Sequence, residues 1–350
     1  MKGWILDKRD RWNEYEHFRF REEARKEDIE ICLYDPRDFD IQITVKGGRS
    51  LTYQGQTVTL PNFVFPRTGA TTDYYDMALI RHLERLTVPV VNSSEAIAVA
   101  RDKLHTMEVL VYHKLPTPKT MLAKFPLNLE LMTEEFQFPV IVKSIAGSRG
   151  KGVFLCETPN QMKDLMDILE LSKKEDVYYV IQEFVAGSKG KDIRVMVVGG
   201  RAIGAILREA QEGKYKANIS MGGAGKPFDL NPEVEWLSVE AAKVLGLDIA
   251  GVDLLADEEG YKVCEANSGP GFKGFEQTTG LNVPRQIYQY IQVRLSGNRV
   301  AATVVDDVQS GVRTQDESVP NTDLSDEQVF QTACGYPTLK ELNVECTLPF

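Results

Sequence analysis

The run Gly251-Val-Asp253-Leu-Leu-Ala-Asp-Glu-Glu-Gly260-Tyr-Lys-Val-Cys-Glu265-Ala-Asn267 holds two apolar-rich segments separated by an acidic turn that ends in glycine. This pattern predicts an antiparallel hairpin. A three-residue loop with Gly260 in the left-handed position would place Asp253 directly opposite Glu265. Asn267 would then follow on the same face, two residues along the strand.

Two carboxylates and an amide oxygen on one face suit Mg²⁺, which takes a few protein oxygens and completes its octahedron with waters and substrate phosphates. A solvated strand face with acidic residues would have the same composition. Apolar neighbours favour the metal interpretation, because they indicate that the opposite face is buried. These neighbours are Val252, Leu254, Val263 and Ala266. We therefore predict a metal site formed by Asp253, Glu265 and Asn267.

A glycine-rich loop lies upstream, in the run Phe138-Pro-Val-Ile-Val-Lys143-Ser-Ile-Ala-Gly-Ser148-Arg-Gly150-Lys-Gly-Val-Phe-Leu. The pattern predicts strand, loop, strand, and the loop offers backbone N–H groups and positive charge to a polyphosphate. Ser148 and Gly150 are candidate contacts within it, and Lys143 at the strand end is placed to hold phosphate oxygens. No Ser or Thr follows the Gly-Lys pair, which excludes a Walker A loop. A mobile hairpin turn with an exposed lysine is the alternative.

Two further segments lie between the loop and the hairpin. Gln182-Glu183-Phe184-Val185 is typical of a hinge between lobes, where backbone groups can contact an adenine edge, although an ordinary buried strand end would look the same. Lys191-Asp192-Ile193-Arg194 follows it. Arg208, at the end of an apolar strand, could supply charge to a transferring phosphoryl group or lie in a solvated turn.

The run Gly269-Pro-Gly271-Phe-Lys-Gly274 matches the dinucleotide fingerprint Gly-x-Gly-x-x-Gly. Its context argues against that function, because it follows a predicted antiparallel hairpin and has no βαβ unit around it. We therefore do not expect a Rossmann domain.

The chain divides into four predicted regions. Residues 1–95 alternate short apolar runs with helical patterns, which predicts an α/β lobe. Two α+β lobes are predicted next, over residues 96–181 and 182–295. One helix, running from Asn92-Ser93-Ser94 to Leu115, is expected to begin the first of these lobes. A hairpin at Gly199-Gly200 is expected in the second. Residues 296–350 lack periodicity and are expected to form an acidic flexible tail.

Composition excludes several classes of protein. The 350 residues have a net charge of −10, of which −6 falls in residues 296–350, and no basic face is evident for nucleic acid. Five scattered cysteines and four histidines show neither a disulfide framework nor zinc-ligand spacing. No apolar run is long enough for a membrane span or a signal peptide, so we expect a cytoplasmic protein that binds neither membranes nor nucleic acid.

In this order, the segments resemble the ATP-grasp superfamily, and most closely the RimK-like glutamate ligases, including the animal enzymes that make N-acetylaspartylglutamate and β-citrylglutamate. The resemblance covers residues 1–295 and implies an ATP-grasp fold, with an α/β lobe followed by two α+β lobes that clasp ATP. Its strongest segments are Phe138–Val153, Gln182–Val198, Gly199–Gly223 and Gly251–Gly280.

The resemblance also implies roles for single residues. Lys103 and Lys143 would bind ATP phosphates, and the loop Ser144–Gly152 would close over them. Glu183, with its neighbours to Val185, would hold adenine, and Asp192 would hold the ribose.

The predicted metal ligands would hold two Mg²⁺ ions, and Mn²⁺ would suit the same oxygen ligands. Lys216 and Asn218 would contact the triphosphate, and Arg208 would stabilise the acylphosphate and tetrahedral states. Arg67, in Phe65-Pro-Arg-Thr-Gly69, is a weaker candidate for substrate contact. Bacterial members often have an Arg before the Asn in the segment where this chain has Lys216-Ala217-Asn218, whereas Pro66–Gly69 looks bacterial. The acceptor is therefore left open.

The function implied is an ATP-dependent carboxylate–amine ligase that adds L-glutamate to a small carboxylate or a peptide C-terminus through an acylphosphate. A related ligase with another amino acid or a carrier-protein acceptor, and a non-catalytic ATP-binding scaffold, are the alternatives. Homo-oligomer formation stays open. The chain's own C-terminal segment, Lys340 to Phe350, is a further acceptor hypothesis, because some relatives modify peptide C-termini.

Overall fold

The computed structural model describes residues 1–44, 50–123, 126–145, 152–171, 178–211 and 224–310. Residues 1–298 form one compact unit. Residues 299–350 form a second unit, of which the structure describes only a helical segment that ends at Ser310.

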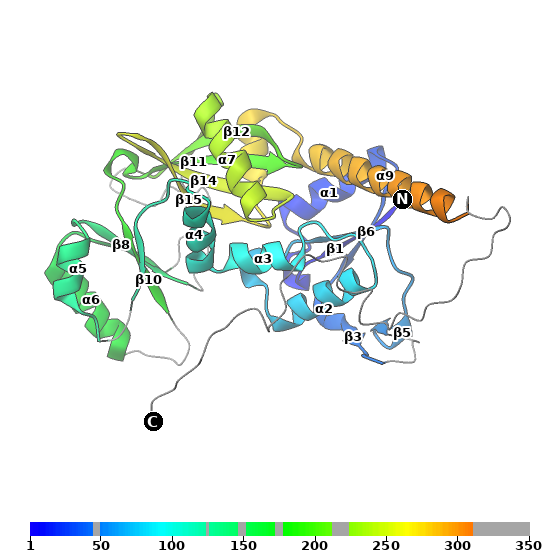
Figure 1. The fold of residues 1–350 in the computed structure, drawn as a ribbon, viewed down its shortest axis with the longest axis horizontal. Coiled ribbons are helices and arrows are strands. Elements are labelled where there is room, and N and C mark those ends of the chain that lie inside the picture. The colour runs from blue at the N-terminus through cyan, green and yellow to red at the C-terminus, as the bar shows by residue number, and fades with distance from the viewer. Residues whose placement is uncertain (45–49, 124–125, 146–151, 172–177, 212–223, 311–350) are drawn as a thin grey trace, which may run out of the picture. The chain divides into compact units, whose positions relative to one another are not determined.

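The N-terminal lobe is built on a parallel sheet in the order β2-β1-β6, and it contains α1 and α2 (Figure 1). Its strands are β1 Lys2–Leu6, β2 Glu30–Tyr34 and β6 Phe63–Pro66, and its helices are α1 Tyr15–Lys26 and α2 Tyr74–Arg85. Asp73 caps α2 by accepting the backbone N–H groups of Tyr75 and Asp76. A small antiparallel sheet and three 3-10 turns complete the lobe: β3 Phe39–Ile41, β4 Leu51–Tyr53, β5 Gln56–Thr57, η1 Arg9–Arg11, η2 Pro36–Asp38 and η3 Gly69–Thr71.

Two helices, rather than the one that we predicted, join this lobe to the next. α3 spans Ser94–Arg101 and α4 spans Lys103–Tyr112. The single helix was wrong because Asp102 leaves the helical conformation and caps α4, with its carboxylate accepting the N–H groups of Leu104 and His105. The break makes Lys103 the first residue of α4.

The central lobe has an antiparallel sheet in the order β7-β10-β8-β9. Its strands are β7 Thr120–Leu122, β8 Val140–Ser144, β9 Val153–Cys156 and β10 Tyr179–Glu183, and its helices are α5 Leu129–Glu135 and α6 Pro159–Leu171. Met132 of α5 and Met162 and Met166 of α6 pack on Val140, Val142 and Ile181 of the sheet. The strands before and after the glycine-rich loop are thus present, as predicted.

The C-terminal lobe has an antiparallel sheet in the order β13-β12-β11-β14-β15. Its strands are β11 Lys191–Val198, β12 Arg201–Glu209, β13 Ala224–Phe228, β14 Ile249–Asp257 and β15 Gly260–Asn267; η4 Ala186–Ser188, α7 Pro232–Val244 and α8 Lys273–Thr279 accompany them. Gly199 and Gly200 both have positive φ, at 58° and 74°, and form the predicted two-residue turn between β11 and β12. One face of the sheet packs on α7, and the four apolar hairpin residues named above are buried there.

The predicted pairing of Asp253 with Glu265 is present, but it arises differently. Asp257 pairs with Gly260, so the turn contains two residues, and the predicted three-residue loop was wrong. A β-bulge compensates: Leu254 pairs with Val263 and Asp253 pairs with Glu265, which leaves Cys264 as the extra residue. The bulge restores the register that the shorter turn would have shifted.

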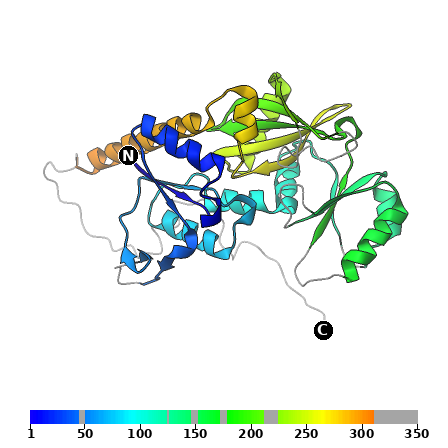
Figure 2. The same cartoon turned by 180° about the vertical axis from the view of Figure 1, so that it is seen from behind.

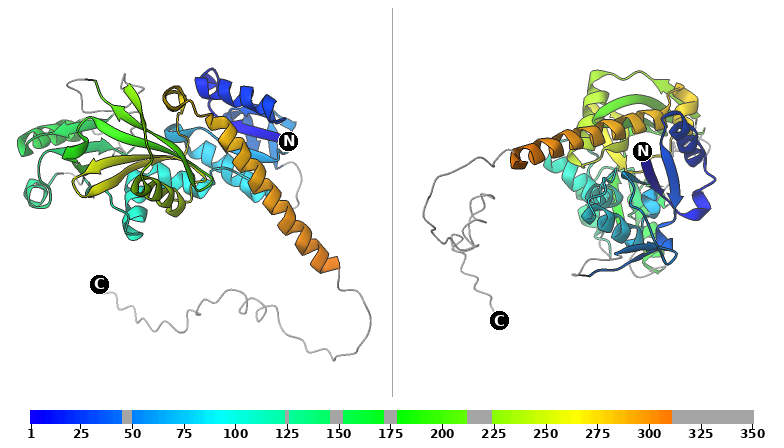
Figure 3. Two further views of the ribbon diagram at one scale, coloured as in Figure 1. Left: turned by 90° about the horizontal axis from the view of Figure 1, so that it is seen from above. Right: turned by 90° about the vertical axis from the view of Figure 1, so that its right-hand side faces the viewer.

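α9, Val283–Ser310, is the long helix coloured orange in Figure 3. Its N-terminal part, within the first unit, packs beside α1, where the hydroxyl of Tyr288 donates to the carbonyl of Phe20 at 3.0 Å (Figure 2). Our expectation of a tail without regular structure from residue 296 was wrong for residues 296–310, because residues 298–310 contain neither glycine nor proline and can extend a helix that has already formed. Residues 311–350 lie outside the described part. Within the described ranges, no helix is long and apolar enough to cross a membrane.

Candidate functional site

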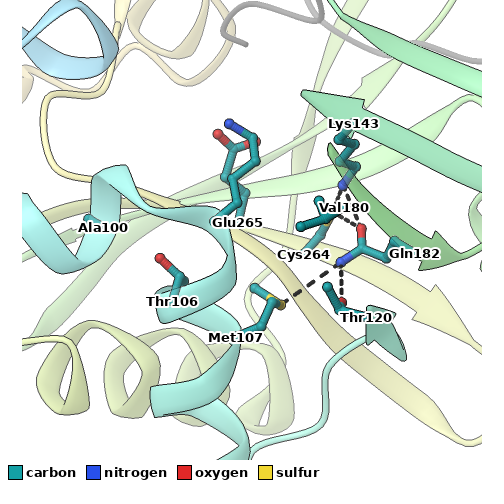
Figure 4. Close-up of a pocket in the computed structure, with 10 residues that line it drawn as sticks. Ala100, Thr106, Met107, Thr120, Lys143, Val180, Gln182, Cys264 and Glu265 are labelled. Atoms are coloured by element: carbon teal, nitrogen blue, oxygen red, sulfur yellow. Dashed lines mark hydrogen bonds between the residues drawn. The ribbon is translucent and has the colours of Figure 1, made fainter. Parts of the chain in front are cut away.

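One pocket brings together residues that lie more than 160 positions apart in the sequence (Figure 4). α3 and α4 contribute one wall, the central sheet a second, and β15 a third. The lining residues are Ala100, Lys103, Thr106, Met107, Thr120, Lys143, Val180, Gln182, Cys264 and Glu265. Four of the predicted site residues, Lys103, Lys143, Gln182 and Glu265, therefore meet in this interlobe pocket.

Lys143 points from β8 toward Gln182 and Cys264 (Figure 4). Its Nζ donates to Gln182 Oε1 at 2.5 Å and approaches Cys264 Sγ at 3.4 Å. Burial works to lower the pKa of Lys143, but Cys264 and the carboxylates of Glu265 and Asp253 raise it above its usual value. The lysine is therefore charged at neutral pH, and its direct partners among the described residues are both neutral, which leaves its charge available to an anion.

The predicted hinge continues from this pocket. Gln182 is buried, and its Nε2 donates to Thr120 Oγ1 at 2.9 Å. Glu183 accepts the backbone N–H of Lys119 at 2.9 Å and the Nζ of Lys262 at 2.7 Å, which ties the end of β10 to the start of β7 in its own lobe and to β15 of the C-terminal lobe. Val185 is buried and Phe184 is half-buried.

The polar face of the C-terminal sheet, opposite α7, holds charged side chains from four neighbouring strands. We call this set the polar face; its members are Asp192, Arg194, Arg208, Asp253, Glu265 and Asn267. Asp253, 5% exposed, is held by both Nε and Nη2 of Arg194, the second at 2.6 Å, and by Nη2 of Arg208 at 3.0 Å. Arg208 Nε also donates to Asp192.

These contacts set the charge state of the polar face. Burial works to raise the pKa of Asp253, but Arg194 and Arg208 outweigh it and hold the pKa below its usual value. Burial would lower the pKa of Arg208, and Asp253 and Asp192 raise it instead. Burial and the nearby Asp253 raise the pKa of Asp192. At neutral pH Asp253 is therefore an anion with two guanidinium partners.

Glu265 is the second carboxylate of the predicted metal site. It lies opposite Asp253 and also lines the interlobe pocket, and no described residue pairs with its carboxylate. Asn267 pairs with Gly251 across the strands, and its side-chain Nδ2 donates to the carbonyl of Gly251 at 3.3 Å. The side-chain oxygen takes no part in this hydrogen bond. Among the described residues, no three His, Cys, Asp or Glu side chains cluster as a metal site. The predicted set has two carboxylates and one amide, which fits a cation that keeps water and phosphate ligands.

Comparison with known proteins places this arrangement in a family. Residues 1–97 match the model of the RimK PreATP-grasp domain, and residues 100–291 match that of the RimK-like ATP-grasp domain. This chain belongs to the RimK-like ATP-grasp family. The predicted family and fold class are confirmed, and the chain is an ATP-dependent ligase that forms amide bonds.

Similar proteins of this ATP-grasp family are known. A protein of Legionella pneumophila (strain Corby), named "Probable alpha-L-glutamate ligase", is 33% identical over 281 residues, which are 79% of this chain and 91% of that protein. The ATP-grasp ligase PsnB, solved with a precursor variant, Mg and ADP, has a TM-score of 0.65 at 20% identity over 83% of this chain and 98% of its own. A RimK domain protein from Sphaerobacter thermophilus has a TM-score of 0.64 at 17% identity, covering 83% of this chain and 99% of its own.

Arg67 of this RimK-like ligase is a buried arginine in an aromatic environment. It is 1% exposed and is surrounded by the rings of Phe65, Phe20 and Phe272, with its Cζ 5.6, 5.7 and 5.8 Å from their centroids. In the described part of the chain, neither its Nε nor its Nη1 has a hydrogen-bond partner. Burial lowers the pKa of Arg67.

Some predicted residues of the ligase lie outside the described part of the chain. They are Ser148 and Gly150 of the glycine-rich loop and Lys216 and Asn218 after β12. Lys103, by contrast, is described: its Nζ donates to the carbonyl of Ile145, just before that loop, at 3.3 Å.

Arg194 and Cys264 received no role from the sequence. Alternation along Lys191–Arg194 places Arg194 on the same face as Asp192, and this signal could have identified it. For Cys264 alternation is misleading, because it predicts that Cys264 and Glu265 point to opposite faces. The bulge at Cys264 lets both line the interlobe pocket.

Proposed function

We propose that this ligase joins the amine of L-glutamate to a carboxylate of a second substrate, which is a small carboxylate or a peptide C-terminus. The observation that carries this proposal is the interlobe pocket, where Lys103 and Lys143 lie beside Glu265, with Asp253 opposite it in the sheet. The names of the relatives, and the precursor and ADP bound to PsnB, support the substrate class.

The chemistry proceeds in two displacements. An oxygen of the acceptor carboxylate attacks the γ-phosphorus of ATP, ADP leaves, and an acylphosphate forms. The glutamate amine then attacks the acyl carbon, the amine loses a proton, and inorganic phosphate leaves with the attacking oxygen. Lys103 and Lys143 bind phosphate oxygens, and Arg208 stabilises the charge on the transferring group and on the tetrahedral state.

The oxygen ligands of the polar face fit magnesium. Asp253, Glu265 and Asn267 would hold one or two Mg²⁺ ions, and Mn²⁺ would suit the same oxygens. When bound, the metal neutralises charge on the phosphate oxygens. Glu265, whose carboxylate has no partner among the described residues, would bind the metal without giving up an ion pair.

The remaining contacts divide between the nucleotide and the substrate. The backbone from Gln182 to Val185 would contact adenine, and Asp192 would contact the ribose. Ser148, Gly150, Lys216 and Asn218 would contact the phosphates. Arg67 would bind a substrate carboxylate, because its guanidinium is buried without a hydrogen-bond partner at Nε or Nη1. A carboxylate supplies the bidentate acceptor that a guanidinium prefers.

Release of ADP tests the proposed reaction. The rate is measured with ATP and Mg²⁺, with glutamate or another amino acid, and with a panel of carboxylates and peptides. We expect fast release only when glutamate and one acceptor class are both present. Equal release with a different amino acid would contradict glutamate as the amine, and ATP binding without release for every pair would contradict catalysis.

The variant Glu265→Gln tests the metal site. We expect turnover to fall by about 10²-fold or more, because the amide cannot neutralise the cation, while the fold is retained. Glu259→Gln is the matched control, since Glu259 is exposed in the turn of the same hairpin. A near-normal rate for the Glu265 variant, in a protein with unchanged circular dichroism, would contradict the metal assignment.

A further inference from the structure

The two carboxylate oxygens of Asp253 are bound by arginines and are also the proposed ligands of Mg²⁺. Arg194 binds both oxygens, and Arg208 adds a second donor to Oδ2. A Mg²⁺ ligand must offer an oxygen lone pair at about 2.0–2.1 Å in a near-octahedral arrangement. A guanidinium that binds the same carboxylate side-on therefore competes with the metal for space and for lone pairs.

Arg194 is better placed than Arg208 to give up its contact. Arg208 has a second carboxylate partner in Asp192, whereas Asp253 is the only ion-pair partner of Arg194 among the described residues. Arg194 also lies in a slot that Gly251 keeps open: a Cβ there would be 3.1 Å from its Nη1 and 3.2 Å from its Cδ. The slot lies beside the metal ligands, because Gly251 pairs with Asn267.

The charge balance of the polar face favours such an exchange. Its three carboxylates and two guanidinium groups leave a net charge of −1 without metal. Lys143 of the interlobe pocket offsets that charge from the central lobe, and the partners that it contacts directly in the described part of the chain are uncharged. Removing Arg194 would leave Asp253, Glu265 and Asp192 with Arg208 as the only cation on the face, and carboxylates this close repel one another.

We propose that Arg194 is a positioning residue that serves as the counter-ion of Asp253 before metal binds and yields the carboxylate to Mg²⁺ when it does. This inference rests on the magnesium use proposed above. Arg194 thereby keeps the metal-free face stable and sets the Mg²⁺ concentration at which the site fills.

The test is thermal unfolding of the full-length protein with saturating ADP and increasing MgCl₂. For Arg194→Met we expect the melting temperature without Mg²⁺ to fall by about 5 °C or more, because a buried ion pair is broken. The Mg²⁺ concentration for half-maximal stabilisation should fall about tenfold, since a unit charge a few ångströms from a divalent ion opposes its binding. Arg194→Lys, with one compact charge, should lie between the variant and the wild type.

Arg19→Met is the matched control, because Arg19 forms a partly buried ion pair with Glu276 at 2.9 Å, away from the polar face. It should lower the melting temperature without changing the half-maximal Mg²⁺ concentration. If Arg194→Met also leaves that concentration unchanged, or raises it, the exchange is wrong. If the wild type itself shows no Mg²⁺-dependent stabilisation, the proposed magnesium use and this inference both fail. If Arg194→Met does not fold, Arg194→Lys decides alone by the same shift.

Discussion

Two buried arginines of this protein have opposite electrostatic environments. Arg208, 6% exposed, lies between the carboxylates of Asp192 and Asp253. Arg67, 1% exposed, lies among three phenylalanine rings and has no hydrogen-bond partner at two of its nitrogens in the described structure. Protein carboxylates thus bind the guanidinium of Arg208 directly, whereas no described group accepts a hydrogen bond from Nε or Nη1 of Arg67.

The magnitudes show why this difference matters. Desolvating a charge costs several kcal/mol, whereas each cation–π contact returns about 0.5–2 kcal/mol. The rings around Arg67 thus offset only part of its cost, whereas the two carboxylates around Arg208 offset most of its own. A fully neutralised arginine suits a fixed electrostatic frame, and a partly neutralised one suits a carboxylate that arrives with substrate.

Arg208→Met should have the largest effect of the changes that test this comparison. We expect a loss of about 3–5 kcal/mol in the free energy of unfolding, because two buried carboxylates lose a partner. Turnover should also fall by about 10²–10³-fold. Denaturant unfolding and ADP release measure the two effects.

Arg201→Met serves as the control, since Arg201 is exposed on the same strand and its loss should change stability by no more than about 0.5 kcal/mol. A loss below 1 kcal/mol for the Arg208 variant would show that the carboxylates do not depend on it.

Arg67→Met should separate binding from stability. We expect the free energy of unfolding not to fall, because the relieved desolvation at least matches the lost cation–π contacts. The KM of the carboxylate-bearing substrate should rise about 10–100-fold, the loss of a charged hydrogen bond, while the KM of ATP stays constant. Steady-state kinetics with each substrate varied in turn measures this split. Lower stability with unchanged KM values would assign Arg67 a structural role only.

Arg37→Met should have the smallest effect, because Arg37 is exposed and pairs with Asp73 at the surface. Partial burial works to raise the pKa of Asp73, but Arg37 and a backbone N–H lower it to about 2. Because the pKa is lower in the folded protein, the ionised carboxylate stabilises the fold at pH values above its unfolded-state pKa of about 4. This stabilisation is lost as the pH falls toward 2. We expect a difference from wild type below about 1 kcal/mol at pH 7 that shrinks as pH falls below 4. A difference that grows in acid would contradict the assignment.

The sequence predicted more of the fold than of the contacts within the site. Strand pairs joined by turn glycines, such as the hairpin at Gly199-Gly200, can be predicted from the local sequence alone. The pairing of Asp253 with Glu265 was also correct, but for the wrong reason, because a bulge compensated for a shorter turn. No glycine marks this bulge in the sequence, so alternation could not predict the placement of Cys264 in the interlobe pocket.

The sequence also failed to predict one helix break and the ion pairs of the polar face. The helix break at Asp102 was missed because apolar periodicity continues across it, although the break is what makes Lys103 the first residue of α4. The double contact of Arg194 with Asp253 depends on the order of strands in the sheet, which separates these residues by 59 positions in the chain. Alternation could predict the face of Arg194, but not its partner.

Ligation through an acylphosphate moves one oxygen of the acceptor carboxylate into inorganic phosphate, and following that oxygen tests the reaction most directly. The acceptor carboxylate is labelled with a heavy oxygen isotope, and mass spectrometry follows both products after incubation with ATP, Mg²⁺ and glutamate. We predict an acceptor enlarged by one glutamyl residue for each ADP, together with inorganic phosphate that contains one labelled oxygen. Unlabelled phosphate, or ADP released without a new amide, would contradict the claim.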